Sequence, residues 1–102
     1  MKKSMEGAQA TLKRMLDQHK LTKGMYVRVH GIHLIVGREE PLGPNGELEK
    51  EDRVRFTQLA TSTYGLSVKR HTGRWERTPF SGNMKQMVDT VLGLMQHLVA
   101  PY

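Results

Sequence analysis

The stretch Tyr64–Pro79, YGLSVKRHTGRWERTP, decides the fold, because it contains two extended runs joined by a turn signal. Thr72-Gly73 lies between the runs, and a glycine in a two-residue turn is typical of a tight hairpin, since it readily adopts a positive φ. A turn at these residues sets Lys69 opposite Glu76, and cross-strand pairs of opposite charge stabilise a register. The sequence therefore predicts an antiparallel hairpin with this pairing.

The predicted register also places the single tryptophan of the chain. Trp75 and Arg77 fall on the face that carries Leu66 and Val68, and Arg70 lies across from Trp75. Two interpretations of the cluster Arg70, Trp75 and Arg77 stay open. Arginine stems pack on a tryptophan at the rim of a core, whereas an exposed Arg–Trp cluster is typical of a protein interaction patch.

The segment before this hairpin is a further strand of the same sheet. Within Arg53–Leu59, Val54 and Phe56 alternate with Arg53 and Arg55. An apolar–polar alternation of this length is typical of a half-buried strand. We therefore expect Arg53 and Arg55 on the polar face.

Near residue 31 the apolar positions change from odd to even. A β-bulge within one long strand, or a short hairpin, would explain the change. The bulge is favoured, because histidine is a poor first residue for a tight hairpin turn at His30-Gly31. It would place Arg28, His30 and His33 on the same polar face.

Amphipathic helices are expected at both ends of the chain. Apolar residues recur every three or four positions in Met5–Lys20, with Ser4 as the N-cap, and over residues 84–99, with the cap within Ser81-Gly82-Asn83. The order of elements predicts an α+β fold of two layers in one domain, residues 1–102. It has an N-terminal helix, an antiparallel meander of about four strands, and a C-terminal helix packed on one face of the sheet.

Composition excludes several classes of protein. The 102 residues include no cysteine, so disulfide scaffolds, thiolate metal sites and cysteine nucleophiles are ruled out. No apolar run approaches the length of a membrane span, and no signal peptide pattern is present. The chain has no nucleophile elbow and no phosphate-binding glycine loop. We expect a soluble, cytoplasmic protein that is not an enzyme and has no cofactor.

Charge is distributed unevenly along the chain. Residues 39–52 contain six of the ten acids and one of the sixteen bases, so this segment carries −5 and the rest of the chain carries +11. The segment is also rich in proline and glycine, which predicts an acidic flexible loop or a loose hairpin tip. A strongly basic body favours polyanionic partners.

The predicted sheet offers a surface for such a partner. Two helices cover one face of an antiparallel sheet and leave the other to solvent. The side chains expected on or around that open face are basic: Arg28, Arg53, Arg55, Lys69 and Arg74. We expect them to bind single-stranded nucleic acid, or another polyanion, through phosphates. Of the aromatic residues only Tyr26 falls on this face, which predicts little base preference.

Two other functions are weighed against this one. The alternative is a homo-oligomeric interaction module, such as a homodimer, that uses the methionine-rich C-terminal helix and the patch Arg70, Trp75 and Arg77. His30 and His33, with Glu39 or Glu40, resemble a metal site on paper, but their spacing is unspecific. We therefore expect no metal.

Overall fold

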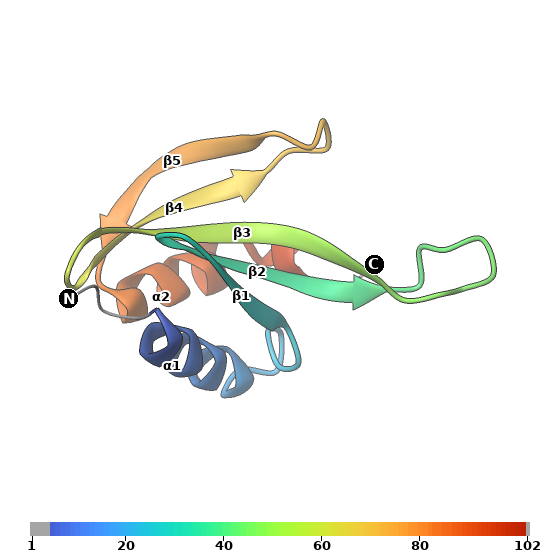
Figure 1. The fold of residues 1–102 in the computed structure, drawn as a ribbon, viewed down its shortest axis with the longest axis horizontal. Coiled ribbons are helices and arrows are strands. Elements are labelled where there is room, and N and C mark those ends of the chain that lie inside the picture. The colour runs from blue at the N-terminus through green and yellow to red at the C-terminus, as the bar shows by residue number, and fades with distance from the viewer. Residues whose placement is uncertain (1–4, 102) are drawn as a thin grey trace.

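The computed structural model of the protein describes residues 5–101. Its elements are α1 Glu6–Asp17, β1 Tyr26–His30, β2 His33–Glu40, β3 Glu49–Ala60, β4 Thr63–Lys69, β5 Trp75–Gly82, α2 Met84–Leu94 and α3 Gln96–Val99. The five strands form one antiparallel sheet in chain order, and the helices lie on one side of it (Figure 1). The predicted two-layer α+β fold is confirmed, with one strand more than expected.

The core lies between the helices and the sheet. Phe56 and Leu34 from the sheet and Leu12 from α1 are completely buried. The apolar stripe of α2 faces the same core, since Met87 and Val91 are only 3% and 1% exposed. The stripe is therefore used for packing within the protomer.

The helix ends differ in detail from the predictions. Asn83 caps α2, and its side chain and that of Gln86 each bond the other's backbone N–H, which is a capping box. The single helix expected over residues 84–99 is broken at Met95 into α2 and α3. Ser4, the predicted cap of the first helix, lies outside the described residues.

The bulge predicted near residue 31 is wrong, because β1 and β2 form a hairpin. His30 pairs with His33 across a two-residue turn, Gly31-Ile32, in which Gly31 has φ +61°. Glycine at the first central position is typical of a two-residue type II′ hairpin turn. The hairpin nevertheless places Arg28, His30 and His33 on one face of the sheet, as the bulge would have done.

The register predicted for the second hairpin is wrong by one residue. Lys69 pairs with Trp75 rather than with Glu76. The loop closes through hydrogen bonds from Arg70 N to Arg74 O and from Gly73 N to Arg70 O. Three residues lie in the loop, and the last has φ +86°, as three-residue hairpins require. A one-residue slip reverses the faces. Trp75 and Arg77 therefore lie opposite Lys69 and Ser67, away from the core.

The acidic segment, expected to be one loop over residues 39–52, is a loop only in its middle part and strand at both ends. β2 continues to Glu40 and β3 begins at Glu49, so the loop spans residues 41–48 only. A register shift at Val36/Gly37 places Gly37 opposite Asp52 and leaves Arg53 as an extra residue in β3. This bulge decides where the arginines of β3 point.

Both outer strands of the sheet have a modified edge. On β1, the Gln9 side chain of α1 donates a hydrogen bond to the carbonyl of Val27 at 2.6 Å. On β5, Pro79 removes one backbone donor.

Candidate functional site

The open face is the side of the sheet that faces away from the helices (Figure 1). Three rows of residues cross it: Arg28, Ile35, Arg55, Ser67 and Arg77; His30, His33, Thr57, Gly65 and Ser81; and Tyr26, Gly37 and Asp52, with Lys69 and Trp75 on the next strands. These rows contain four bases and one acid. Ile35 is only 4% exposed although it lies outside the helix-packed core, so the long side chains of neighbouring strands cover it.

Trp75 lies among cations on this face. The guanidinium carbon of Arg55 is 4.8 Å from the centroid of the indole ring, and the ammonium of Lys69 is 5.9 Å from it. Both distances are within the range of cation–π attraction. The single tryptophan is therefore part of the basic surface and not of the core.

Arg55 has no ion-pair partner among residues 5–101. Its Nε is buried and makes no hydrogen bond in this part of the chain. Burial lowers the pKa of the Arg55 guanidinium from its ordinary value. A cation without a carboxylate beside it favours an incoming anion, because the terminal N–H groups of its guanidinium can donate to that anion.

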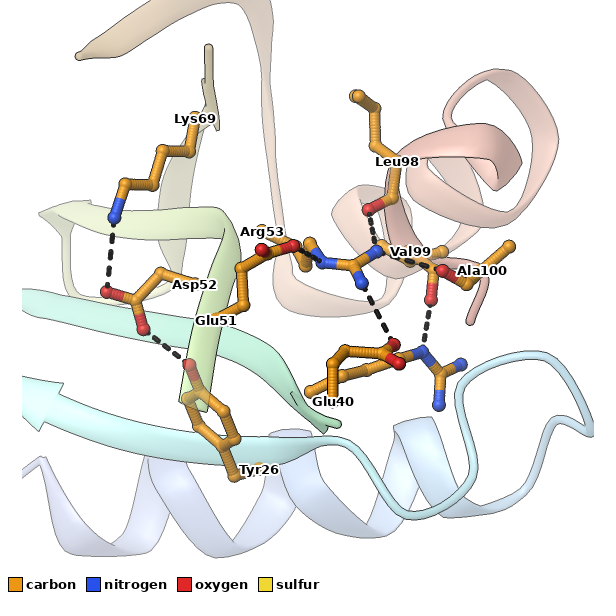
Figure 2. A network of polar contacts seen from close by, with 10 residues as sticks. Tyr26, Glu40, Glu51, Asp52, Arg53, Lys69, Leu98, Val99 and Ala100 are labelled. Carbon is orange, nitrogen blue, oxygen red and sulfur yellow. Dashed lines mark hydrogen bonds and ion pairs between the residues drawn. The ribbon is translucent and has the colours of Figure 1, made fainter. Parts of the chain in front are cut away.

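Arg28 and Lys69 lie around the carboxylate of Asp52. Arg28 Nη2 is 2.6 Å from Asp52 Oδ2, the Tyr26 hydroxyl donates to Oδ1 at 2.6 Å, and Lys69 is 3.9 Å away. Figure 2 shows Asp52 between Tyr26 and Lys69. Burial raises the pKa of Asp52, but the bonds from Arg28 and Tyr26 outweigh it and leave the pKa below its ordinary value. Arg28, a predicted contact, is thus largely neutralised.

Arg53 is the predicted contact whose placement on the open face is wrong. It is 6% exposed and lies on the helix side of the sheet, where Nη1 donates to the carbonyls of Leu98 and Ala100 at 2.8 and 2.9 Å (Figure 2). Its guanidinium also pairs with Glu40 at 3.1 Å and with Glu51 at 2.9 Å. Arg53 holds the end of α3, and its buried guanidinium is not accessible to a ligand on the open face.

The remaining predicted residues are separated by the new register. Arg70 pairs with Glu76 at 3.1 Å on an exposed part of the hairpin, so the patch Arg70, Trp75 and Arg77 does not form as one surface. Arg77 stays near Trp75, two residues along β5. Arg74 is exposed in the loop before β5, outside the three rows.

The histidines of the first hairpin lie together on the open face. The His30 and His33 rings are stacked, with centroids 6.4 Å apart, and Nδ1 of His33 is 2.8 Å from the Thr57 hydroxyl. Burial, and then the charges of Arg55 and His30, lower the pKa of His33. Within residues 5–101 no three histidine or acidic side chains are grouped closely enough to hold a metal ion.

Sequence reasoning missed two residues of the open face. A two-residue turn at Thr72-Gly73 predicts Trp75 and Arg77 on the apolar face, whereas the three-residue loop places them on the open face. The sequence did contain an indication of the observed register, because Glu76 can form an ion pair with Arg70 as well as with Lys69.

Comparison with family models, with curated proteins and with solved structures found no match to this chain. No helix in the described part of the chain is both long enough and apolar enough to cross a membrane. The cytoplasmic location and the lack of enzyme activity stay predictions.

Proposed function

We propose that the open face binds single-stranded nucleic acid, with cations on the phosphates and Trp75 stacked on a base. One observation carries the proposal: the Arg55 guanidinium lies 4.8 Å from the Trp75 ring and has no carboxylate partner within residues 5–101. A cation and an aromatic ring side by side are the two elements from which non-specific single-strand sites are built.

The phosphate contacts are fewer than the sequence suggested. Arg53 is committed to α3, and Arg28 is paired with Asp52. Arg55 and Arg77 remain on the open face as cations for phosphates, together with Lys69, whose distance to Asp52 is the longer one at 3.9 Å. Each contact on a single strand contributes about −0.7 to the slope of log K against log salt, so three contacts predict a slope of about −2.

Trp75 on the open face adds base stacking to the phosphate contacts. Stacking of a base on an aromatic side chain contributes about 1–3 kcal/mol and tolerates every base. The face is therefore expected to bind single strands more tightly than duplexes, whose bases are already stacked.

The experiment uses the single tryptophan as its own reporter. A labelled oligothymidylate of about 12 nucleotides is titrated at about 50 mM salt while anisotropy and Trp75 emission are followed together. Binding is expected with quenching of the emission, because a base stacks on the ring. Trp75→Leu is expected to weaken binding about 5- to 150-fold, the equivalent of that stacking energy.

Arg77→Ala and Arg74→Ala form a matched pair, since each removes one exposed arginine near Trp75. Arg77→Ala is expected to make the salt slope less steep by about 0.7, and Arg74→Ala is expected to leave it nearly unchanged. No binding at about 10 μM protein in low salt, or wild-type affinity in Trp75→Leu, would overturn the proposal.

A further inference from the structure

A groove of about 460 Å³ lies on the open face between β3 and β5, with β4 as its floor. Its volume is within the range of small-molecule sites, which is about 300–1,000 Å³. Gly65 and Ser67 of β4 line the floor. Gly65 lacks a side chain, and a Cβ there would lie 3.3 Å from Leu59 Cδ1, so larger side chains would fill the groove.

One part of the groove is cationic. Arg55 and Arg77 lie on either side of Ser67 in one row of the sheet. Adjacent strands are about 4.8 Å apart, so the two arginine backbones are roughly 10 Å apart, and both side chains can reach one anion above Ser67. Within residues 5–101, no aspartate or glutamate lines the groove. Guanidinium groups bind phosphate oxygens through paired N–H donors, which suits a phosphate at this position.

The other part of the groove is apolar. Leu59, Pro79 and Phe80 line it, and Leu59 is 51% exposed. An exposed leucine beside a proline and an aromatic ring offers a surface on which a flat ring can be buried. A simple phosphate would leave this apolar wall unused.

We propose that the groove holds one nucleotide unit, with its phosphate between Arg55 and Arg77 and its base against Leu59, Pro79 and Phe80. This inference rests on the proposed function and deepens it. Trp75, beside Arg55, takes the neighbouring base of the strand. The groove thus gives the open face a defined starting point for a single strand.

The test compares three ligands by isothermal titration calorimetry in low salt: adenosine 5′-monophosphate, ribose 5-phosphate and inorganic phosphate. The mononucleotide is expected to bind at least about tenfold more tightly than ribose 5-phosphate, because only it buries a base on the apolar wall. Equal affinities for the three ligands would overturn the proposal and leave a plain anion site.

Two variants test the wall and the floor of the groove. Gly65→Val is expected to weaken mononucleotide binding at least about tenfold by filling the floor. Leu59→Ala, at an exposed position that does not endanger folding, is expected to weaken the mononucleotide about threefold and inorganic phosphate not at all. Leu94→Ala is the matched control, an exposed leucine on α2. Wild-type mononucleotide affinity in a folded Gly65→Val and in Leu59→Ala would contradict the proposal.

The two proposals fail in different ways. If the oligonucleotide binds and the mononucleotide binds no better than phosphate, the groove proposal is wrong and the proposed function stands. If the mononucleotide binds and the oligonucleotide does not, the groove takes free nucleotides and the proposed function is wrong. If neither binds, both are wrong.

Discussion

Arg53 and Arg55 are two residues apart on the same strand, and we predict that replacing each by alanine affects a different property of the protein. Arg53→Ala removes a guanidinium that holds the carbonyls of Leu98 and Ala100 and pairs with Glu40. Arg55→Ala removes a cation that lies over the Trp75 ring and has no carboxylate partner within residues 5–101. The first change is expected to damage the fold and the second to damage the proposed binding.

The magnitude follows from the burial of the Arg53–Glu40 pair. The side chains are 6% and 7% exposed, and removing one partner of such a pair costs about 3–5 kcal/mol, because the other charge stays buried without compensation. For a domain of this size 1 kcal/mol shifts the melting temperature by about 4–8 °C, so Arg53→Ala is expected to lower it by at least about 12 °C. Arg55→Ala loses a cation–π contact that contributes about 0.5–2 kcal/mol.

Thermal and urea unfolding followed by circular dichroism measures both variants, and oligonucleotide binding is then measured in the cold, where Arg53→Ala is folded. Folded Arg53→Ala is expected to bind like wild type. The double variant Arg53→Met with Glu40→Leu is expected to recover much of the lost stability, since no buried charge remains unpaired. A loss below about 1 kcal/mol in Arg53→Ala would refute the assignment of Arg53 to the end of α3.

Three further changes test the packing and the electrostatics. Gly37→Ala is expected to destabilise the protein by about 1–3 kcal/mol in urea unfolding, because its Cβ would lie 2.2 Å from the Glu51 carbonyl oxygen and 2.3 Å from the Tyr26 hydroxyl. Gly93→Ala is the control, since the added Cβ meets open space, and it is expected to be neutral or stabilising. Met87→Glu is expected to unfold the protein, as seen by circular dichroism, whereas Leu94→Glu, at a position that is 63% exposed, is expected to stay folded. A folded Met87→Glu variant of lower mass in light scattering would instead support the dimer hypothesis. The pKa of Asp52 is lowered in the folded protein, so its contribution to stability is complete above about pH 4 and is lost as the pH falls through the folded pKa. The difference in unfolding free energy between wild type and Asp52→Asn is therefore expected to be constant above about pH 4 and to shrink below it; a constant difference down to pH about 2 would contradict this assignment.

The elements of the fold could be predicted because each carries a periodic pattern. The stripe with Met87 and Val91 predicted a C-terminal helix on the sheet, and the alternation around Phe56 predicted a strand. These patterns depend on which residues are apolar, and burial of the apolar face enforces them. The break at Met95 has no such pattern, since the stripe continues through it.

The site could be predicted only in part, because it depends on single-residue shifts. Alternation placed Arg53 with Arg55, but the bulge opposite Val36/Gly37 turns Arg53 to the helix side. The three-residue loop ending at Gly73 turns Trp75 to the open face. A bulge or one more loop residue costs little locally and leaves no distinct pattern, yet it changes the face of every residue beyond it.

The modified edges of β1 and β5 affect how molecules of this protein can associate. An exposed sheet edge offers unpaired N–H and C=O groups to a strand of another molecule, and pairing of sheets edge to edge leads to aggregation. The bond from Gln9 to the Val27 carbonyl occupies one acceptor on β1, and Pro79 deletes one donor on β5. Strand addition at either end is therefore disfavoured. The sheet is therefore expected to stay five strands wide, and crowded copies of the protein are expected not to join through these edges.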